Sequence, residues 1–402
     1  MVARHRHGIR AALIVTLLLA TCAPATVAAA GELAAADCHP VQVSVALTPN
    51  GPANARLTGQ VCYPTDPATA IPGAIQVLVS GLTYGQSYWD FPYQPDTYSY
   101  VQAAARAGFT TFDFDRIGIG QSTHPASTQV SIPSNAYTIH QAIQQLRAGT
   151  LDGTQYSKVV IVGHSLGSLI SWYEAGTYHD VDAVVASGIL HSFNDLGVAQ
   201  LVTTLYPAAL DPRFLGRIVD PGYLTTLPGT RENSFYYPPA TDPAVAQIDE
   251  ASKETGTVPE ASGVFAMELP GVLRPLSQVV CAATPGLCDG VASSIIYGIT
   301  RSITVPVLTV VGQYDALLCG GANSANQCAD VGAVKQAESA YYTGATRQCL
   351  TLAELTNAGH DVNLEPNAQG WFALASDWSR FTLAHSNGTC WSGTAPAGVL
   401  LP

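Results

Sequence analysis

The sequence predicts an α/β fold built on a mostly parallel, doubly wound sheet, and three observations support this prediction. Short runs of consecutive apolar residues, rich in Val and Ile, alternate along the chain with longer stretches of helical periodicity. Because these runs lack the alternation of a half-exposed strand, we expect strands that helices cover on both faces. The apolar fraction of 47% and the charged fraction of 11% indicate a large buried core. With 402 residues, the chain suits one such core that carries an insertion.

The first residues have the features of a secretory signal peptide. Three arginines precede an apolar run at residues 11–20, and small residues at 26–30 offer a cleavage site. The run is shorter than the roughly 20 apolar residues that a membrane-spanning helix needs. We therefore predict that residues 1–30 are removed and that the mature protein is secreted, without a transmembrane segment. A minor alternative is a lipid anchor at Cys22, whose surroundings resemble a lipoprotein cleavage box.

Residues 31–190 are predicted to form the first part of the core, beginning with an N-terminal β-hairpin. Two alternating runs, 41–45 and 57–63, flank a Pro-Asn-Gly-Pro turn. Further along, we expect strands near 75–79, 110–114, 159–162 and 183–186, separated by helices near 98–107, 137–148 and 166–178.

The rhythm of strands and helices breaks over residues 191–300, which contain many Pro, Gly and Tyr residues and show no obvious strand. A piece at 198–206 looks helical. The second part of the core, residues 301–402, resumes with strands near 305–311 and 350–352 and a helix at 369–384. We therefore predict that 191–300 is an insertion forming a lid over the carboxyl edge of the sheet, where open α/β sheets bind ligands.

Eight of the nine cysteines follow the predicted signal peptide, and an even number in an exported chain indicates disulfides. Their local placement favours four pairs, namely Cys38–Cys62, Cys281–Cys288, Cys319–Cys328 and Cys349–Cys390. No cysteine spacing resembles a zinc ribbon, so these residues give no reason to expect a metal. The formal net charge of −12 argues against nucleic acid as a partner.

The strongest local motif is Gly163-His164-Ser165-Leu166-Gly167, which follows an apolar strand and precedes a helix. The turn is so tight that a side chain at either glycine would collide with the neighbouring strand or helix. Ser165 would then stand above the sheet beside the first N–H groups of the helix. This strand–turn–helix arrangement resembles the nucleophile elbow of the α/β-hydrolase superfamily, and the resemblance spans about residues 70–385.

The resemblance assigns further roles. The loop at 80–85 looks like the superfamily's oxyanion loop, although Ser80 stands where a His is usual. It implies that the backbone N–H groups of Leu82 and Leu166 stabilise a developing oxyanion, with Thr83 as the alternative to Leu82. The Asp115–Ser122 segment resembles a supporting loop of the same family, without a catalytic role.

Asp315 follows the strand at 305–311, where family members carry the acid of their triad, and His360 lies in a Gly-His loop after the last strand. The order Ser165, Asp315, His360 is the one expected of this fold. Asp195 and Asp330 are rival acids. His164, inside the elbow, is expected to face away from the reaction.

Together these residues predict hydrolysis of a small-molecule or lipid-like carboxylic ester through an acyl-enzyme, without a metal or organic cofactor. Tyr84 and Trp89 follow the oxyanion loop and are candidate substrate-binding residues, although packing of the lid on the core explains them equally well. Lactones, amides and polyesters remain open as substrates. The alternatives are an acyltransferase with the same triad and a non-catalytic binding protein on a hydrolase scaffold.

Overall fold

The computed structural model describes Met1 and residues 35–266, 298–320, 328, 330–385 and 388–402. The signal-peptide prediction, including Cys22, lies outside the described residues, as does the pair Cys281–Cys288. The fold is that of the unit spanning residues 34–402.

A nine-stranded sheet forms the centre of this unit, in the order β1-β2-β4-β3-β5-β6-β10-β11-β12. The strands from β4 to β11 run parallel, while β1, β2 and β12 pair antiparallel at the edges. The strands are β1 Ala36–Val45, β2 Ala55–Pro64, β3 Ala74–Val79, β4 Thr110–Asp115, β5 Lys158–His164, β6 Ala183–Ser187, β10 Val307–Gly312, β11 Thr351–Leu355 and β12 Val399–Leu400. The predicted fold class and the N-terminal hairpin are confirmed.

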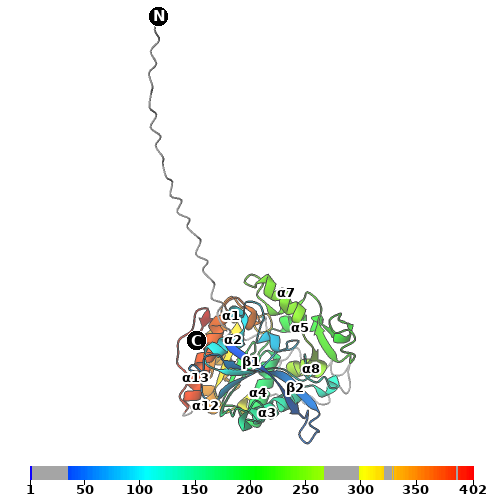
Figure 1. Ribbon diagram of the computed structural model, residues 1–402, viewed down its shortest axis with the longest axis horizontal. Coiled ribbons are helices and arrows are strands. Elements are labelled where there is room, and N and C mark those ends of the chain that lie inside the picture. Colours follow the sequence, from blue (N-terminus) through cyan, green and yellow to red (C-terminus); the bar gives the residue numbers. More distant parts are fainter. Residues whose placement is uncertain (2–34, 267–297, 321–327, 329, 386–387) are drawn as a thin grey trace. The chain divides into compact units, whose positions relative to one another are not determined.

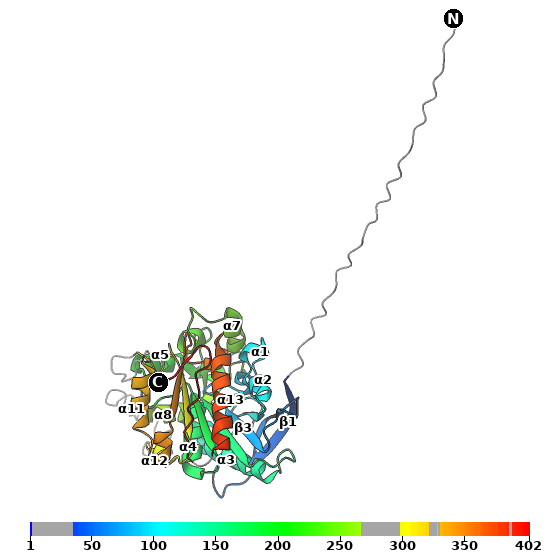
Figure 2. The same cartoon turned by 90° about the vertical axis from the view of Figure 1, so that its left-hand side faces the viewer.

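The continuous apolar runs predicted buried strands, and every residue of β3, β4, β6, β10 and β11 is buried. Helices α3 and α4 pack together on one face of the sheet, and α2 and α13 pack together on the other (Figure 2). These helices and their shorter neighbours are α1 Pro95–Tyr98, α2 Tyr100–Arg106, α3 Ile132–Ala148, α4 Leu166–Tyr178, α11 Val331–Ser339, α12 Gly344–Gln348 and α13 Ala368–Ala384. Single 3₁₀ turns occur at Gln86–Tyr88, Ser127–Gln129, Ala208–Leu210, Ile299–Ser302 and Val362–Leu364.

Helix α3 begins five residues before its predicted start at residue 137. The reason is a capping box, in which Ser131 and Ser134 each satisfy a backbone N–H of the other. The helix ends at Ala148, and Gly149 caps it with a φ of 70°.

Between β6 and β10 the chain leaves the main sheet and builds a separate group of elements. They are α5 Asp195–Thr204, β7 Leu205–Pro207, β8 Tyr223–Thr226, α6 Arg231–Phe235, α7 Pro243–Ser252, β9 Gly256–Thr257 and α8 Val258–Ala266. Figure 1 shows α5 and α7 on the side opposite α3. Although the sequence shows no obvious strand here, β7, β8 and β9 form a small antiparallel sheet. Strands of two to four residues are too short to show a period-2 pattern.

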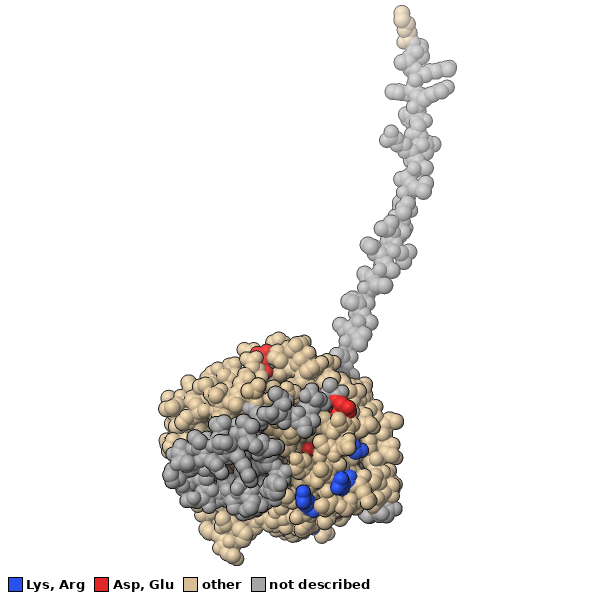
Figure 3. All heavy atoms as spheres, turned by 180° about the vertical axis from the view of Figure 1, so that it is seen from behind, with Lys and Arg blue, Asp and Glu red and all other residues tan. Residues whose placement is uncertain are grey.

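Three disulfides lie within the described residues, and each is a predicted pair: Cys38–Cys62, Cys319–Cys328 and Cys349–Cys390. The first joins paired positions of the hairpin strands. The described part of the chain contains no helix long and apolar enough to cross a membrane. Few charged side chains appear on the face shown in Figure 3, in keeping with the low charged fraction.

Candidate active site

Ser165 lies in the sharp turn that joins β5 to α4. Its backbone has φ 52° and ψ −119°, a positive φ that residues with a side chain rarely adopt. The Ser165 N–H donates to the carbonyl oxygen of Ser187, at the end of β6, over 2.8 Å. Ser165 is partly exposed, whereas the strand before it is buried. This geometry presents the hydroxyl above the sheet, as a nucleophile elbow does.

The two glycines of the motif are required by close backbone contacts. A Cβ at Gly163 would lie 2.6 Å from the Cα of Ser168, and one at Gly167 would lie 2.0 Å from the carbonyl oxygen of Val79. Both distances are far below van der Waals contact. Helix α4 can therefore start immediately after β5 only because neither position carries a side chain.

His360 lies between Ser165 and Asp315. Its Nε2 is 2.8 Å from the Ser165 Oγ, and its Nδ1 is 2.8 Å from the Asp315 Oδ2. The Leu317 N–H donates to the other oxygen of Asp315 over 2.9 Å, which fixes the carboxylate. His360 is 3% exposed and Asp315 is fully buried. The three predicted side chains thus form one hydrogen-bonded chain.

The electrostatics of this chain favour a basic imidazole. Burial alone lowers the pKa of His360, but the charge of Asp315, the hydrogen bond to it and the charge of Asp361 outweigh burial and raise the pKa above its ordinary value. A neighbouring carboxylate has this effect because it stabilises the imidazolium.

Asp330, one of the two rival acids, has another role in the fold. Asp330 caps α11, where its carboxylate accepts the Ala333 N–H over 3.0 Å. Asp195 is the first residue of α5, and its side chain is outside the described set. Of the three candidates, the structure brings Asp315 to His360.

The loop after β3 lies directly against the elbow. A Cβ at Gly81 would be 3.3 Å from the Ser165 Cβ. Within the described part of the chain, the backbone N–H groups of Leu82 and Leu166 donate to no other protein group. Leu166 opens α4, and the first N–H groups of a helix have no partner inside it. Both N–H groups are therefore available to an oxygen bound beside Ser165.

Arg116 holds this loop from beneath. Its guanidinium donates to the carbonyl oxygens of Ser80 and Gly81 over 2.9 and 3.0 Å. It also forms a fully buried ion pair with Glu260, which lies on α8 of the segment between β6 and β10. The Asp115–Ser122 motif, predicted as a supporting loop, thus contributes an arginine whose acidic partner the sequence did not indicate.

A second buried ion pair reaches the loop from the same segment. Arg231 donates to both oxygens of Asp249 over 2.9 and 3.0 Å, and to the Thr83 hydroxyl over 2.8 Å. Its guanidinium also stacks 4.2 Å above the ring of Tyr84. The sequence did not single out Arg231 or Asp249, because residues that pair across the fold leave no local pattern.

His164 and Asp361 form a buried pair behind the triad. The His164 Nε2 is 3.1 Å from Asp361, and the Tyr84 hydroxyl contacts the same carboxylate. Burial, together with the charge of His360, lowers the pKa of His164 well below its usual range, so its imidazole is neutral. Burial raises the pKa of Asp361 to about 6, although the charges of His360 and Arg231 oppose this shift. Asp361 is therefore a titratable group adjacent to the base that sequence reasoning did not single out.

A narrow cavity opens at Ser165 and has mainly apolar walls. Tyr84 and Leu82 line it from the core side. No Asp, Glu, Lys or Arg lines it among the residues that the structure describes. The segment between β6 and β10 contributes Phe193, Val198, Leu201, Leu205, Phe235 and Ala261.

Trp89 is placed differently from Tyr84. It is fully buried and packs against Tyr88 and Tyr100. It is not among the described lining residues of the cavity, so its position is explained by core packing. A bulky aromatic residue that follows the loop after β3 can line the cavity or pack in the core, and the sequence alone did not distinguish these two positions.

Residues 81–227 match the family described as alpha/beta hydrolase fold. This match covers the loop after β3, the turn at Ser165 and the beginning of the segment after β6. The chain has the α/β-hydrolase fold. Comparison with curated protein sequences found no match.

Solved structures with similarity to this α/β-hydrolase fold include an esterase from Thermogutta terrifontis, with 15% identity, a TM-score of 0.47 and coverage of 86% of this chain and 99% of that one. A monoacylglycerol lipase from Paleococcus ferrophilus has 17% identity, a TM-score of 0.46 and coverage of 78% and 96%. Because one fold supports many chemistries, the functional conclusion rests on the site.

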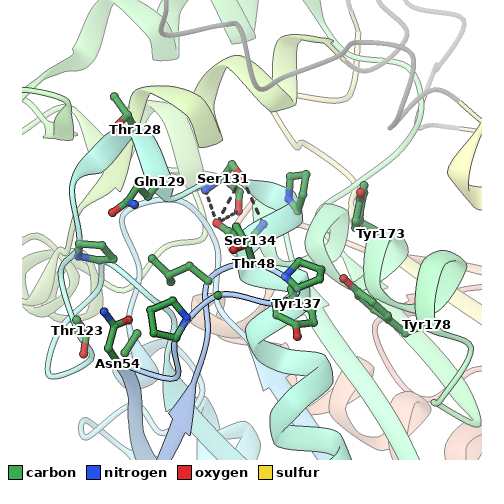
Figure 4. Close-up of a pocket in the computed structure, with 17 residues that line it drawn as sticks. Thr48, Asn54, Thr123, Thr128, Gln129, Ser131, Ser134, Tyr137, Tyr173 and Tyr178 are labelled. Atoms are coloured by element: carbon green, nitrogen blue, oxygen red, sulfur yellow. Dashed lines mark hydrogen bonds between the residues drawn. The ribbon is translucent and has the colours of Figure 1, made fainter.

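A larger hollow of about 770 Å³ lies elsewhere on this α/β-hydrolase fold. Figure 4 shows its lining residues, which come from the β1–β2 turn, the segment leading into α3, and α4. Its size does not make it the active site, because none of the triad residues lines it.

Proposed function

We propose that this protein is a secreted serine hydrolase that cleaves uncharged carboxylic esters through an acyl-enzyme. The observation that carries the proposal is the chain from Ser165 to His360 to Asp315, with 2.8 Å at both links. A hydroxyl bonded to a buried imidazole, which a carboxylate orients in turn, is the arrangement that activates a serine.

In the first step, the Ser165 Oγ attacks the ester carbonyl carbon while the His360 Nε2 takes its proton. The carbonyl oxygen becomes an oxyanion, and the N–H groups of Leu82 and Leu166 donate to it. His360 then gives the proton to the leaving alkoxide, so an alcohol departs and an acyl-Ser165 ester remains. In the second step, water attacks this ester with the same proton transfers and releases the carboxylic acid. No organic cofactor or metal takes part in these steps.

The cavity wall supports the substrate class. Apolar side chains from the core and from the segment between β6 and β10 surround Ser165, and no ionised carboxylate, ammonium or guanidinium is among the described lining residues. A charged acyl group would lose its hydration there without gaining a partner. We therefore expect an apolar acyl group in the cavity, with Tyr84 as part of its wall. We also propose that residues 191–300 are an insertion that forms a lid over the carboxyl edge of the sheet.

The test is covalent labelling with a fluorophosphonate, followed by peptide mapping. We expect one adduct, on Ser165, and none in Ser165→Ala, whose hydrolysis of p-nitrophenyl esters falls by roughly 10⁴-fold or more. Equal labelling of Ser165→Ala would overturn the assignment. Product analysis with added alcohol separates hydrolysis from acyl transfer, because a transferase would give the new ester in preference to the acid.

A further inference from the structure

Three side chains that the proposed reaction does not use converge far along α4 from Ser165. His140 lies on α3, Glu174 lies on α4, and Asp180 follows α4. One nitrogen or oxygen donor atom of each lies within 4.8 Å of the others. Glu174 is nine residues beyond Ser165, which corresponds to about 14 Å along a helix axis. The cluster is therefore separate from the candidate active site.

Glu174 is the observation that sets this cluster apart from an ordinary group of surface acids. Its side chain is fully buried, and among the described residues no N–H or O–H group donates to its carboxylate oxygens, which instead contact the carboxyl group of Asp180. One oxygen of Asp180 is also buried without a donor group among the residues that the structure describes, and the Asp180 carboxyl group is within hydrogen-bond reach of Glu174. Burying an unpaired carboxylate is strongly unfavourable. Either a proton shared by the two carboxyl groups or a cation between their oxygens would offset that cost.

His140 is already oriented toward the same point. Its Nδ1 is 2.7 Å from the Asp180 Oδ2, and its ring stacks on Tyr178 with centroids 4.1 Å apart. The Gln144 side chain, one turn further along α3, donates to the same Asp180 oxygen over 2.6 Å. The stacking and the hydrogen bonds fix the ring and the carboxylate, as the supporting groups around a metal site do.

The cluster is also reachable from solvent. The side chains of His140 and Asp180 are 24% and 12% exposed. Tyr178, against which His140 stacks, lines the hollow shown in Figure 4, where it lies beside Tyr137. An ion can therefore enter from the surface, although Glu174 beneath is closed to water.

Arg147 is a neighbouring cation, but its guanidinium does not donate to the side chain of Glu174 or Asp180. Arg147 donates to the Asp180 main-chain carbonyl over 2.7 and 2.9 Å and to the Asp182 carboxylate over 2.8 Å. Its guanidinium therefore donates to groups other than the carboxylates of Glu174 and Asp180. When both are ionised, Glu174 and Asp180 present two negative charges to one point.

We propose that His140, Glu174 and Asp180 bind a structural Zn²⁺ ion, with water in the fourth position. One imidazole nitrogen and two carboxylate oxygens are donors that Zn²⁺ accepts, at about 2.0–2.2 Å each. Donor atoms of such a tetrahedral site lie roughly 3.4 Å apart, so small side-chain rotations close the cluster from its present spread. Bound there, the ion joins α3 to the end of α4 and stabilises the fold without touching the reaction.

The experiment uses the purified, untagged protein, stripped with a chelator and titrated with ZnCl₂ in a calorimeter, with the melting temperature measured in parallel. We expect one Zn²⁺ per chain and a higher melting temperature. Glu174→Gln and His140→Gln should each weaken binding by at least about 100-fold and remove the thermal shift, since even an outer partner of a metal ligand is worth about 10–100-fold in affinity. Ester hydrolysis should be unchanged by the ion.

His39→Gln is the matched control, because His39 is also 3.3 Å from an acid, Asp37, but both are mostly exposed. It should bind Zn²⁺ as the unaltered protein does. If Glu174→Gln does not fold, the half-buried His140→Gln still gives the answer. Absence of Zn²⁺ binding, or equal binding by all variants, would overturn the proposal and leave a proton shared by Glu174 and Asp180. A thermal shift with CaCl₂ alone would overturn the choice of Zn²⁺, since Ca²⁺ prefers oxygen ligands.

Discussion

Replacing Gly167 with Ala tests whether the start of α4 and the oxyanion loop must touch. The new Cβ would lie 2.0 Å from the Val79 carbonyl oxygen and 2.7 Å from that of Ser80. Both are backbone atoms, one at the end of β3 and the other at the start of the loop that follows it. No side chain can rotate away to relieve this contact, so the helix and the loop must separate.

The magnitude follows from the distances. Restoring even the tightest tolerated contact, 3.0 Å, from 2.0 Å requires a separation of about 1 Å. A misplacement of that size costs on the order of 10²-fold in rate, and complete loss of one oxyanion donor costs roughly 10²–10³-fold. We therefore expect kcat/KM for p-nitrophenyl esters to fall by about 10²–10³-fold. Overpacking should also lower the free energy of unfolding by about 1–3 kcal/mol.

Gly332 provides a matched control, because it occupies the same second position of a helix, α11, as Gly167 does in α4. A Cβ there would meet only one atom of Asp330, at 3.3 Å. Gly332→Ala should leave activity unchanged and should not destabilise the protein, since Ala is favoured over Gly in helices. Measurements are ester hydrolysis and urea unfolding of both variants. Activity of Gly167→Ala within about threefold of the unaltered protein, with normal stability, would refute the reasoning.

Three further predictions follow from the same contacts. Asp315→Asn should lower kcat by about 10⁴-fold because the imidazolium loses its partner, and near-normal turnover in steady-state assays would move the acid role to Asp195. Activity should fall as pH drops through the raised pKa of His360, because the base must be neutral. Asp361→Asn should move this acidic limb to lower pH, since the Asp361 charge helps to raise that pKa; a shift to higher pH in the kcat/KM profile would contradict it. Glu354 is buried on β11 and has no hydrogen-bond partner among the residues that the structure describes, and burial raises its pKa to about 7. Its folded state holds the proton more tightly than the unfolded state, so stability falls as pH rises from about 4.5 to about 7. Glu354→Gln should therefore stabilise the protein at pH 8 but not at pH 4; equal effects in urea unfolding at both values would show this account to be wrong.

The features predicted correctly from the sequence are those that depend on neighbours along the chain. Residues 159–162 are apolar in succession and form the buried middle of β5, and the elbow follows because its two glycines permit the tight turn. The start of α4 at Leu166 and its end at Tyr178 agree with the predicted range. Asp315 and His360 were placed by their position after strands, which a resemblance to a family supplies.

The features that were missed depend on contacts between distant segments. Arg116 and Glu260 are 144 residues apart, and nothing in either local sequence indicates that both are buried. The same holds for Arg231 and its contact with Thr83, 148 residues away. Trp89 was a candidate substrate-binding residue because it lies close in sequence to the loop after β3. Closeness along the chain does not determine the direction of a side chain, and that of Trp89 is buried in the core.

The pairing of Arg116 with Glu260 has a consequence for any attempt to exchange the segment between β6 and β10 for that of another protein. If this segment only lined the cavity, it could be exchanged without affecting the rest of the fold. Here it supplies the acidic partner of an arginine that holds the Ser80 and Gly81 carbonyls. A transplanted segment without that acid would leave a buried, unpaired guanidinium, at a cost of about 3–5 kcal/mol, directly beneath the oxyanion loop. Specificity can therefore be altered by grafting only if the graft carries an equivalent of Glu260, whereas wall residues such as Val198 and Leu201 are free to change.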